Sequence, residues 1–288
     1  MNPLTQISNI KAIMQKHNFT FSKALGQNFL INSAVPAHIA EVAGVDENTN
    51  VIEIGPGFGT LTYELCKAAK KVVAIEIDKR LIPVLQDTMA EFDNLKIVNE
   101  DVLKLDLHKL IEEEFDGSRV IVCANLPYYI TSPIIMSLLE KRLPVESITV
   151  MIQKEVAKRF DSKAGSSDYG AVTLSAQYYS ETKLHFDVSP GSFMPAPKVT
   201  SSVISFYVRD EAPVKPQNEV FMFQIIKAAF NQRRKTLSNA LANILTPKVE
   251  KVAILQALRD LGLNENIRGE ALSLEDFARL SDLLLIKK

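Results

Sequence analysis

The segment Asn125-Leu126-Pro127-Tyr128 places two hydrogen-bond acceptors and an aromatic ring within four residues. The Asn125 side-chain oxygen and the Leu126 carbonyl oxygen can together accept both hydrogens of one amine. Pro127 restricts the main chain so that this carbonyl can point inward, and Tyr128 offers a flat face for stacking of a base. An exocyclic ring amine such as N6 of adenine, held in this way, can attack a methyl–sulfonium bond in line. These four residues therefore predict a catalytic loop for amine methylation, in which no strong general base is needed.

A glycine-rich turn, Gly55-Pro56-Gly57-Phe58-Gly59, lies nearer the N-terminus. Glycine is needed where the main chain turns tightly and where a ligand approaches closer than a Cβ would allow. The spacing is G-x-G-x-G, and Thr60 stands where a dinucleotide fingerprint has its third glycine. This form is more common where the ligand is S-adenosylmethionine, so we expect Gly55 and Gly57 to border that cofactor.

Two carboxylates follow the next predicted strands. Glu76 comes 21 residues after Gly55, where it can accept hydrogen bonds from both hydroxyls of an adenosine ribose. Asp78 competes for this role, but its position at the start of the next helix is more typical of a cap. Asp101 follows the third strand and could accept from the adenine amine of the cofactor, although a loop aspartate is more often a turn residue. The glycine turn and Glu76 alone fit either NAD or S-adenosylmethionine.

From about residue 50 the chain alternates short β-branched runs with longer amphipathic stretches. Strands are predicted at 51–54, 71–77, 95–98, 119–124 and 147–152, and later at 183–188 and 203–208. Strands that alternate with helices predict right-handed crossovers and a mainly parallel sheet covered on both faces. The last two strands predict a hairpin-like end with one antiparallel strand. The candidate residues would then lie at the carboxyl edge of an open α/β sheet, where such folds bind ligands.

A change of pattern near residue 210 predicts a domain boundary. Residues 211–218 have the proline-containing composition of a linker, and 219–288 show only helical periodicity. We therefore expect a catalytic, cofactor-binding domain over 1–210 and a small all-helical domain over 211–288.

The composition is that of an ordinary soluble globular protein, with 288 residues, 47% of them hydrophobic, and a net charge of −1. The N-terminus lacks a secretory pattern, and no apolar run approaches the roughly 18 residues that span a bilayer, so we expect a cytoplasmic protein. Cys66 and Cys123 lie far apart in apolar runs, and the four histidines do not cluster. We therefore expect reduced thiols and no bound metal.

Basic residues gather in two places. Residues 1–40 contain Lys23 and two other lysines but no acid, and Arg233-Arg234-Lys235 form a second cluster. Such clusters suit contacts with RNA phosphates, although solvated helix faces have the same composition. We expect Lys23 to contact phosphates, together with residues 233–235 on a helix of the C-terminal domain.

Two further segments and the catalytic loop carry a resemblance to a known family. Residues 23–30, KALGQNFL, precede the first predicted strand, and residues 193–201, FMPAPKVTS, join the last two. With the loop at 125–128 they resemble the ribosomal RNA adenine dimethyltransferases over nearly the whole chain. Residues 230–237 and 268–273 are similar to the small-subunit branch of that family. The resemblance implies a Rossmann-like S-adenosylmethionine-dependent methyltransferase fold, with a mainly parallel seven-stranded sheet whose last strand is antiparallel.

The resemblance also implies the reaction and its partners. The small-subunit enzymes dimethylate N6 of two adjacent adenosines in the 3′-terminal hairpin loop of 16S rRNA, so 16S rRNA or an immature 30S subunit is the implied partner. The implied cofactor contacts on this sequence are Asn28, Leu30, Gly55, Glu76, Asp101 and Asn125. Phe193 would stack on the target base opposite Tyr128, and its proline-rich surroundings form a stiff loop that can present an aromatic ring. Because no heptad or long exposed edge is visible, we expect a monomer.

Three alternatives remain open. An Erm-type 23S rRNA adenine methyltransferase would share the catalytic loop, but the C-terminal segments argue for the small-subunit branch. A mainly non-catalytic ribosome assembly factor would keep the fold, and the intact loop and Glu76 argue against lost activity but not against an additional assembly role. An NAD-dependent dehydrogenase would complete the G-x-G-x-x-G motif and supply a catalytic His or Tyr/Lys pair, which the sequence does not offer.

Overall fold

The computed structural model describes residues 2–22, 26–244 and 249–286. The chain packs as two compact units. The first comprises Met1–Ala157 and Thr182–Val208, and the second comprises Lys158–Glu181 and Arg209–Lys288. The second unit is therefore discontinuous in sequence, because residues 158–181 pack with the C-terminal helices. A single division at residue 210 had assigned that segment to the first domain.

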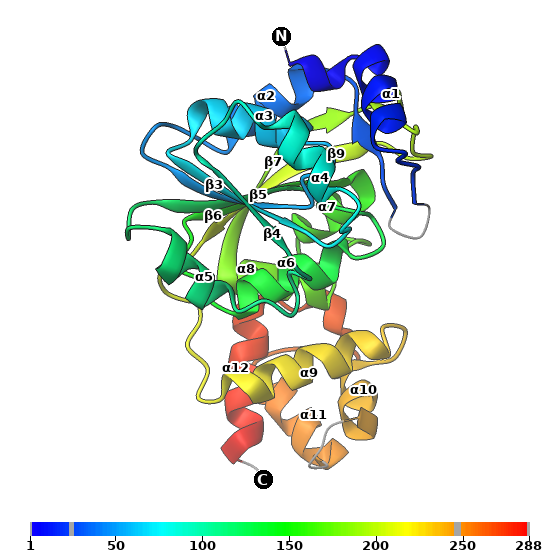
Figure 1. Ribbon diagram of the computed structural model, residues 1–288. Coiled ribbons are helices and arrows are strands. Elements are labelled where there is room, and N and C mark those ends of the chain that lie inside the picture. Colours follow the sequence, from blue (N-terminus) through cyan, green and yellow to red (C-terminus); the bar gives the residue numbers. More distant parts are fainter. Residues whose placement is uncertain (1, 23–25, 245–248, 287–288) are drawn as a thin grey trace. The chain divides into compact units, whose positions relative to one another are not determined.

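A seven-stranded sheet in the order β4-β3-β2-β5-β6-β9-β7 forms the centre of the first unit (Figure 1). The strands are β2 (Asn50–Ile54), β3 (Lys71–Glu76), β4 (Leu95–Asn99), β5 (Val120–Asn125), β6 (Ser147–Gln153), β7 (Ser180–Val188) and β9 (Ser201–Val208). Neighbouring strands from β4 to β6 are parallel, and β9 is antiparallel to β6. The predicted fold class, a mainly parallel seven-stranded sheet whose last strand is antiparallel, is confirmed.

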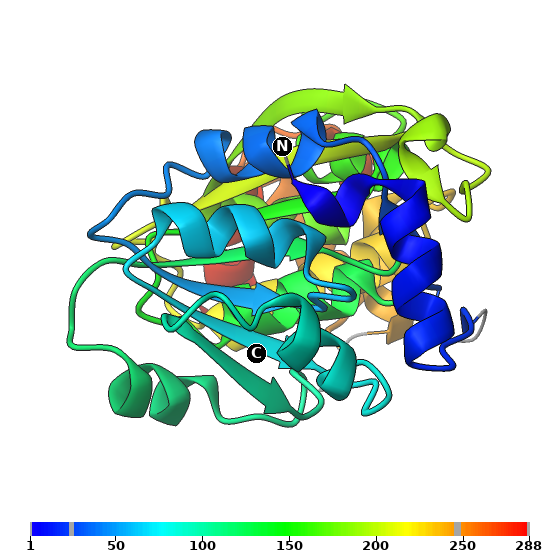
Figure 2. The same cartoon turned by 45° about the horizontal axis from the view of Figure 1, so that its top comes forward.

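Helices cover both faces of this sheet. One face carries α2 (Ala34–Val42), α3 (Thr60–Ala68) and α4 (Ile82–Thr88), and the other carries α5 (Leu107–Glu114) and α6 (Thr131–Glu140) (Figures 1 and 2). The strands between them have the near-continuous apolar sequence of strands buried on both faces, and in β5 the residues from Val120 to Ala124 are all buried. Leu61 and Leu65 of α3 pack against Val51 and Ile121 of the sheet.

The carboxyl ends of the central strands lie level with one another. Ile54, the last residue of β2, pairs with both Ile75 of β3 and Ala124 of β5, and Glu76 pairs with Asn99 of β4. On one side of β2 the sheet continues with β3 and β4, and on the other side it continues with β5 and β6. The chain therefore changes direction across the sheet between β2 and β5, and this is the switch point where open α/β sheets bind ligands.

The N-terminal segment reaches this edge through a second, two-stranded sheet. After η1 (Pro3–Thr5) and α1 (Ile7–Lys16), β1 (Phe29–Leu30) pairs antiparallel with β8 (Phe193–Met194), which follows η2 (Pro190–Ser192). The Phe29 ring stacks on Phe58 of the glycine turn, with centroids 4.2 Å apart. Residues 27–30 thus end in a short strand.

The second unit is helical and has its own core. It contains the end of α7 (Lys154–Phe160), α8 (Ala171–Tyr179), α9 (Glu219–Asn231), α10 (Leu237–Ile244), α11 (Lys251–Asp260), η3 (Gly269–Ala271) and α12 (Leu274–Ile286). Asn218 caps α9 by accepting from Phe221 N–H at 2.9 Å. Helix α11 ends before Gly262, which has φ +71°.

In the described part of the chain, no helix is long and apolar enough to cross a membrane. The same residues contain no group of three His, Cys, Asp or Glu side chains that could hold a metal ion. Cys66 and Cys123 are free and buried, and burial raises the pKa of both thiols.

Candidate active site

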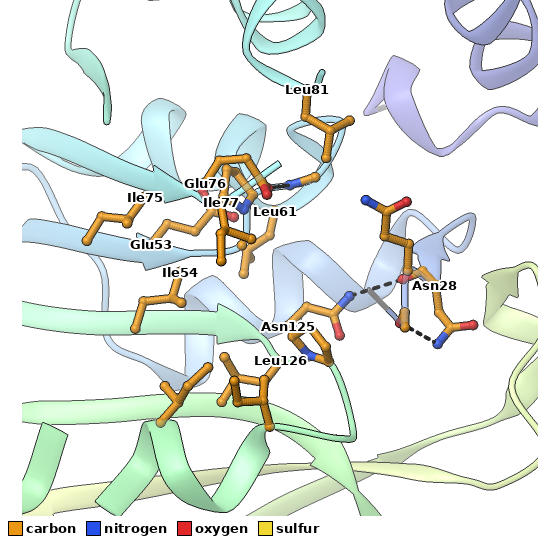
Figure 3. A pocket seen from close by; sticks show the side chains of 18 of the residues that line it. Asn28, Glu53, Ile54, Leu61, Ile75, Glu76, Ile77, Leu81, Asn125 and Leu126 are labelled. Atoms are coloured by element: carbon orange, nitrogen blue, oxygen red, sulfur yellow. Dashed lines mark hydrogen bonds between the residues drawn. The ribbon is translucent and has the colours of Figure 1, made fainter. Parts of the chain in front are cut away.

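A pocket opens at the carboxyl edge of β2, β3 and β5 (Figure 3). The space between its walls, including the part that is open to solvent, has a volume of about 1100 Å³. Its lining includes every described residue predicted to bind cofactor or target base: Asn28, Leu30, Gly55, Gly57, Glu76, Asp101, Asn125, Leu126, Pro127, Tyr128 and Phe193. Segments from six separate parts of the chain therefore meet in one cavity.

The glycine turn leaves bare main chain on the pocket wall. Gly55, Gly57 and Gly59 have φ of +70°, +62° and +89°, a region that other residues rarely adopt. A Cβ on Gly55 would meet no protein atom within 4 Å, whereas one on Gly57 would lie 2.7 Å from the Phe29 ring. Gly55 thus allows close approach of a ligand, and Gly57 allows close approach of the N-terminal segment.

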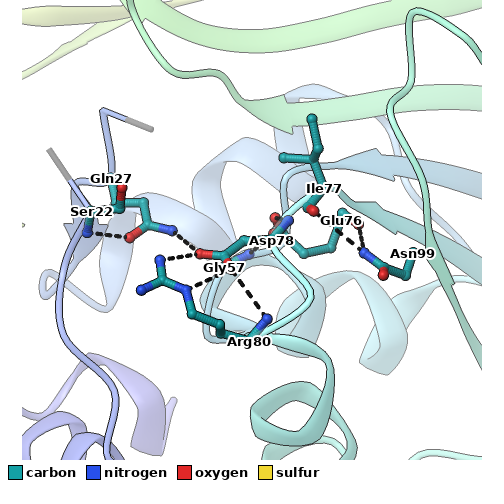
Figure 4. Close-up of polar contacts among 8 residues, drawn as sticks. All are labelled: Ser22, Gln27, Gly57, Glu76, Ile77, Asp78, Arg80 and Asn99. Atoms are coloured by element: carbon teal, nitrogen blue, oxygen red, sulfur yellow. Dashed lines mark hydrogen bonds and ion pairs between the residues drawn. The ribbon is translucent and has the colours of Figure 1, made fainter. Parts of the chain in front are cut away.

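Glu76 lies at the end of β3 with both carboxylate oxygens held by main-chain donors. The N–H of Asp78 donates to Oε1 at 2.8 Å, and the N–H of Gly57 donates to Oε2 at 3.3 Å (Figure 4). Burial raises the pKa of Glu76 to about 6, against the effect of these two hydrogen bonds. At neutral pH the group is therefore an ionised acceptor, and each oxygen keeps a lone pair for a ligand hydroxyl.

Asp78, the competing acid, is engaged outside the pocket. Its carboxylate accepts from Arg80 Nε and Nη2 at 2.9 and 2.6 Å and from Gln27 Nε2 at 3.0 Å (Figure 4). The Arg80 guanidinium holds the pKa of Asp78 below its usual range. Asp78 also accepts from the Arg80 N–H at 3.1 Å, which stabilises the turn before α4, whereas the N-cap residue of that helix is Leu81.

The same contacts tie the N-terminal segment to the end of β3. Gln27 donates to Asp78 and accepts from the Ser22 N–H (Figure 4). The Arg80 guanidinium lies 5.2 Å from the centre of the Phe19 ring. Lys23, predicted to contact phosphates, lies outside the described residues.

Asn125 ends β5 and points its amide toward the N-terminal segment. Its Nδ2 donates to the Asn28 carbonyl oxygen at 3.4 Å, which leaves Oδ1 available as an acceptor (Figure 3). The next peptide is held by the sheet, because the Leu126 N–H donates to the Met151 carbonyl oxygen at 3.2 Å. The Pro127 carbonyl oxygen accepts from the Thr131 hydroxyl at 3.1 Å and so connects the loop to the start of α6. The loop is fixed at both ends.

Tyr128 and Phe193 bring aromatic rings to the pocket from segments far apart in the sequence. Tyr128 is half-buried, and its hydroxyl lies 2.7 Å from that of Ser201. Phe193 is only 3% exposed and pairs with Leu30 in the two-stranded sheet. Both rings are therefore held by neighbours before any ligand binds.

Asp101 is a turn residue that also lines the pocket. Its Oδ1 accepts from the Leu103 N–H at 3.0 Å, and its Oδ2 lies 4.0 Å from Lys104 Nζ. The turn contact holds the carboxylate in one orientation, and its contact with the cofactor amine stays a prediction.

Ile77 and Glu53 are among the pocket residues that were not predicted from the sequence. Ile77 is 56% exposed beside Glu76, and it provides an apolar surface suited to a flat ring. Glu53 is a fully buried acid of β2 whose Oε2 has no hydrogen-bond partner, and burial raises its pKa to about 8. An apolar residue directly after Glu76, and an acid inside an apolar strand, were the available signals.

The basic cluster at 233–235 lies in the turn between α9 and α10, so its prediction on a helix is wrong. The Lys235 N–H donates to the Gln232 carbonyl oxygen at 2.8 Å and closes this turn. Arg233 Nε lies 2.7 Å from Glu270 Oε2, whereas Arg234 and Lys235 are exposed. The three residues therefore differ in what they contact.

Known proteins resemble this chain over both units. The family model described as Ribosomal RNA adenine dimethylase matches residues 18–285. A protein named Ribosomal RNA small subunit methyltransferase A from Shouchella clausii is 51% identical over 274 residues, which cover 95% of this chain and 93% of the relative. A protein of the same name from Lachnoclostridium phytofermentans is 49% identical over 273 residues, 94% of each chain.

Two solved structures are similar at the level of the whole fold. A dimethyladenosine transferase from Plasmodium falciparum has a TM-score of 0.73 at 27% identity, covering 88% of this chain and 95% of its own. The 23S rRNA methyltransferase ErmE has a TM-score of 0.65 at 26% identity, covering 89% of this chain and 99% of its own.

Proposed function

This chain belongs to the ribosomal RNA adenine dimethylase family, and on that basis we propose its substrate and the roles of its pocket residues. It is an S-adenosylmethionine-dependent rRNA methyltransferase. The proposed reaction is dimethylation of N6 on two adjacent adenosines in the 3′-terminal hairpin loop of 16S rRNA. The names of its relatives, which are 49% and 51% identical, support the small subunit as its target.

The pocket suits S-adenosylmethionine, which supplies the methyl group when bound. Glu76 presents an ionised, pre-oriented carboxylate for the two ribose hydroxyls, and Gly55 offers bare main chain beside it. Ile77 and Asp101 flank that position with an apolar surface and an acceptor, which suit an adenine ring and its amine. Asn28 and Leu30 complete the proposed cofactor wall from the N-terminal side.

The unpartnered Glu53 oxygen gives the pocket a buried acid near the glycine turn. Such a group favours a cationic ligand, because a nearby positive charge stabilises its ionised form. The amino-acid portion of the cofactor carries an ammonium group of this kind. We therefore assign Glu53 to that portion of the site.

The target amine is held by the loop after β5. Asn125 Oδ1 and the Leu126 carbonyl oxygen accept its two hydrogens, and Tyr128 and Phe193 stack on the ring. The nitrogen lone pair forms the new N–C bond as the C–S bond breaks, and the alkylated nitrogen then loses its proton to solvent. For the second transfer the amine has one N–H left, so only one of the two acceptors can be used.

One observation carries this proposal: Asn125 and Leu126 end β5 in the same pocket as Gly55 and Glu76. The decisive variant is Asn125→Ala, assayed for methyl transfer to immature 30S subunits that lack the modification. We expect a loss of about 100-fold or more, as for removal of one preorganised polar group from an active site. Transfer at near wild-type rates would show that the mechanism is wrong.

Mass spectrometry of the modified rRNA separates the substrate question from the mechanism. Methyl groups on two adjacent adenosines near the 3′ end of 16S rRNA support the proposal. Modification of 23S rRNA instead would favour the Erm-type reaction, which the similarity to ErmE keeps as the second candidate. An Asn125→Ala chain that still restored subunit assembly would reveal an assembly role besides catalysis.

For the RNA contact we propose phosphate binding by Lys23, Arg234 and Lys235, with the second unit, which comprises residues 158–181 and 209–288, as an rRNA-binding module. Arg234 and Lys235 are exposed, which supports this role. Arg233 is assigned instead to holding the turn, through its ion pair with Glu270.

The proposal has the protein act as a monomer, in the cytoplasm, on an immature 30S subunit.

A further inference from the structure

Tyr129 lies at the mouth of the pocket, one residue after the proposed stacking wall Tyr128. It is 60% exposed, although it belongs to the pocket lining. Ile77 and Tyr129 are the only large hydrophobic residues of the described chain that are both exposed and part of this lining. Ile77 borders Glu76 at the proposed cofactor end, so Tyr129 is left at the end where the RNA must enter.

The Tyr129 ring is supported on one side by main chain. A Cβ built on Gly26 would lie 3.3 Å from Tyr129 Cδ1, 3.6 Å from its Cε1 and 3.6 Å from Pro127 Cβ. Gly26 has φ +58°, so both its backbone conformation and the space beside it favour glycine. The ring therefore rests against the Gly26 main chain and is open to solvent elsewhere. Such a ring is ready to stack without further ordering.

We propose that Tyr129 is a stacking platform for the nucleobase adjacent to the target adenosine in the RNA strand. The inference rests on the proposed function, because it needs an adenine held against Tyr128. Turning that adenine into the pocket removes it from the stack of bases and leaves its neighbour without a partner on one side. An exposed ring one residue beyond the pocket wall can replace that partner, since every base offers a π-face.

The test uses small subunits reconstituted with 16S rRNA whose synthetic 3′ segment carries 2-aminopurine next to the target adenosine. Binding is followed in the presence of S-adenosylhomocysteine, so that no transfer occurs. Wild-type protein and Tyr129→Phe should quench the fluorescent base on one side of the target. Tyr129→Ala should lose this quenching and bind about 5- to 150-fold more weakly, as expected for one base–aromatic stack.

Two controls separate stacking from a structural effect. Tyr207→Ala removes another exposed aromatic residue of the same unit, outside the pocket lining, and should leave binding and quenching unchanged. An abasic site in place of the neighbouring base should weaken wild-type binding but add nothing to the loss in Tyr129→Ala. Affinity for S-adenosylhomocysteine should be equal in all variants.

The proposal is overturned if Tyr129→Ala quenches and binds as the wild type does, or if the abasic site weakens both proteins equally. These outcomes differ from a failure of the proposed function. If the proposed function is wrong, neither the wild-type protein nor any Tyr129 variant transfers a methyl group to the same reconstituted subunit.

Discussion

The phenol oxygen of Tyr128 lies 2.7 Å from the hydroxyl oxygen of Ser201, the first residue of β9. Ser201 is fully buried and pairs with Gln153 of β6, so the hydroxyl that meets Tyr128 is anchored in the sheet. One wall of the proposed base slot is therefore positioned by a strand that lies about 70 residues later in the chain.

Replacing Ser201 with alanine should slow methyl transfer about three- to tenfold, because a neutral hydrogen bond contributes about 1 kcal/mol. Tyr128→Phe removes the other half of the same contact and should cost a similar factor. The double variant should be no slower than the slower single variant in single-turnover assays. Ser205→Ala is the matched control, since Ser205 lies in the same strand as Ser201 but contacts Thr149 of β6 and His185 of β7 instead of Tyr128. Losses that multiply in the double variant would contradict a shared role.

Cofactor affinity should fall in acid through Glu76. The folded cofactor-free protein has a raised pKa of about 6 at this group, against an ordinary value of 4.5. Its protonated form, which has lost an acceptor, therefore predominates below pH 6, and binding should weaken about tenfold by pH 5. Calorimetric titration between pH 5 and 8 measures this, and Glu76→Gln should bind weakly and lose the part of the dependence centred near pH 6, while any dependence through Glu53 near pH 8 remains. A wild-type affinity that is flat over this range would count against Glu76 as the ribose acceptor.

The raised pKa of Glu76 also makes the stability of the folded protein depend on pH. A raised carboxyl pKa means that the folded chain binds this proton more tightly than the unfolded chain does. The stabilising contribution of Glu76 is then fully present below pH 4.5 and is lost as the pH rises through 6. Bound cofactor should offset this loss, so its thermal stabilisation should be larger at pH 7 than at pH 5.

A side chain at Gly57 should damage the pocket wall. Gly57→Ala adds a Cβ 2.7 Å from the Phe29 ring and places alanine at φ +62°. Gly117→Ala is the matched control, because Gly117 has φ +80° but open space around it. The control should cost about 1 kcal/mol of unfolding free energy through backbone strain alone. Gly57→Ala should cost more in chemical denaturation and should also weaken cofactor binding, which the control should not.

Substitutions in the basic turn at 233–235 should affect rRNA binding at two positions and the stability of the second unit at the third. Replacing both Arg234 and Lys235 with alanine should weaken rRNA binding and reduce the slope of log K against log salt by about 1.5, for two lost phosphate contacts. Arg233→Ala should leave that slope nearly unchanged and lower the stability of the unit, and Glu270→Ala should reproduce this effect. An equal loss of slope from Arg233→Ala would assign that residue to the RNA as well.

The strands and the edge they form were predictable because their signals are local. The β-branched runs of β2, β3 and β5 end at Gly55, Glu76 and Asn125, and parallel strands bring those ends to one edge. The alternation of strands and helices was sufficient for the mainly parallel sheet, and the change of pattern near 210 was sufficient for a helical C-terminal region.

Other features depend on contacts between distant segments, which no local pattern encodes. Strands β1 and β8 have two residues each, too few for any periodicity, and pair across most of the first unit. Residues 158–181 contain helix-forming sequence that suits either unit, and only packing assigns them to the second. Helical propensity continues through Arg233 and Lys235, but the turn there is stabilised by an ion pair to Glu270, 37 residues later.

The register of the two-stranded sheet connects the two ligands thermodynamically. Leu30, on the proposed cofactor wall, is paired with Phe193, on the proposed target-base wall. Because this pair is formed before either ligand binds, the two walls of the pocket share one structural element. Any factor by which S-adenosylmethionine tightens the binding of rRNA must equal the factor by which rRNA tightens the binding of S-adenosylmethionine. A displacement of either strand by one ligand would therefore be felt equally by the other.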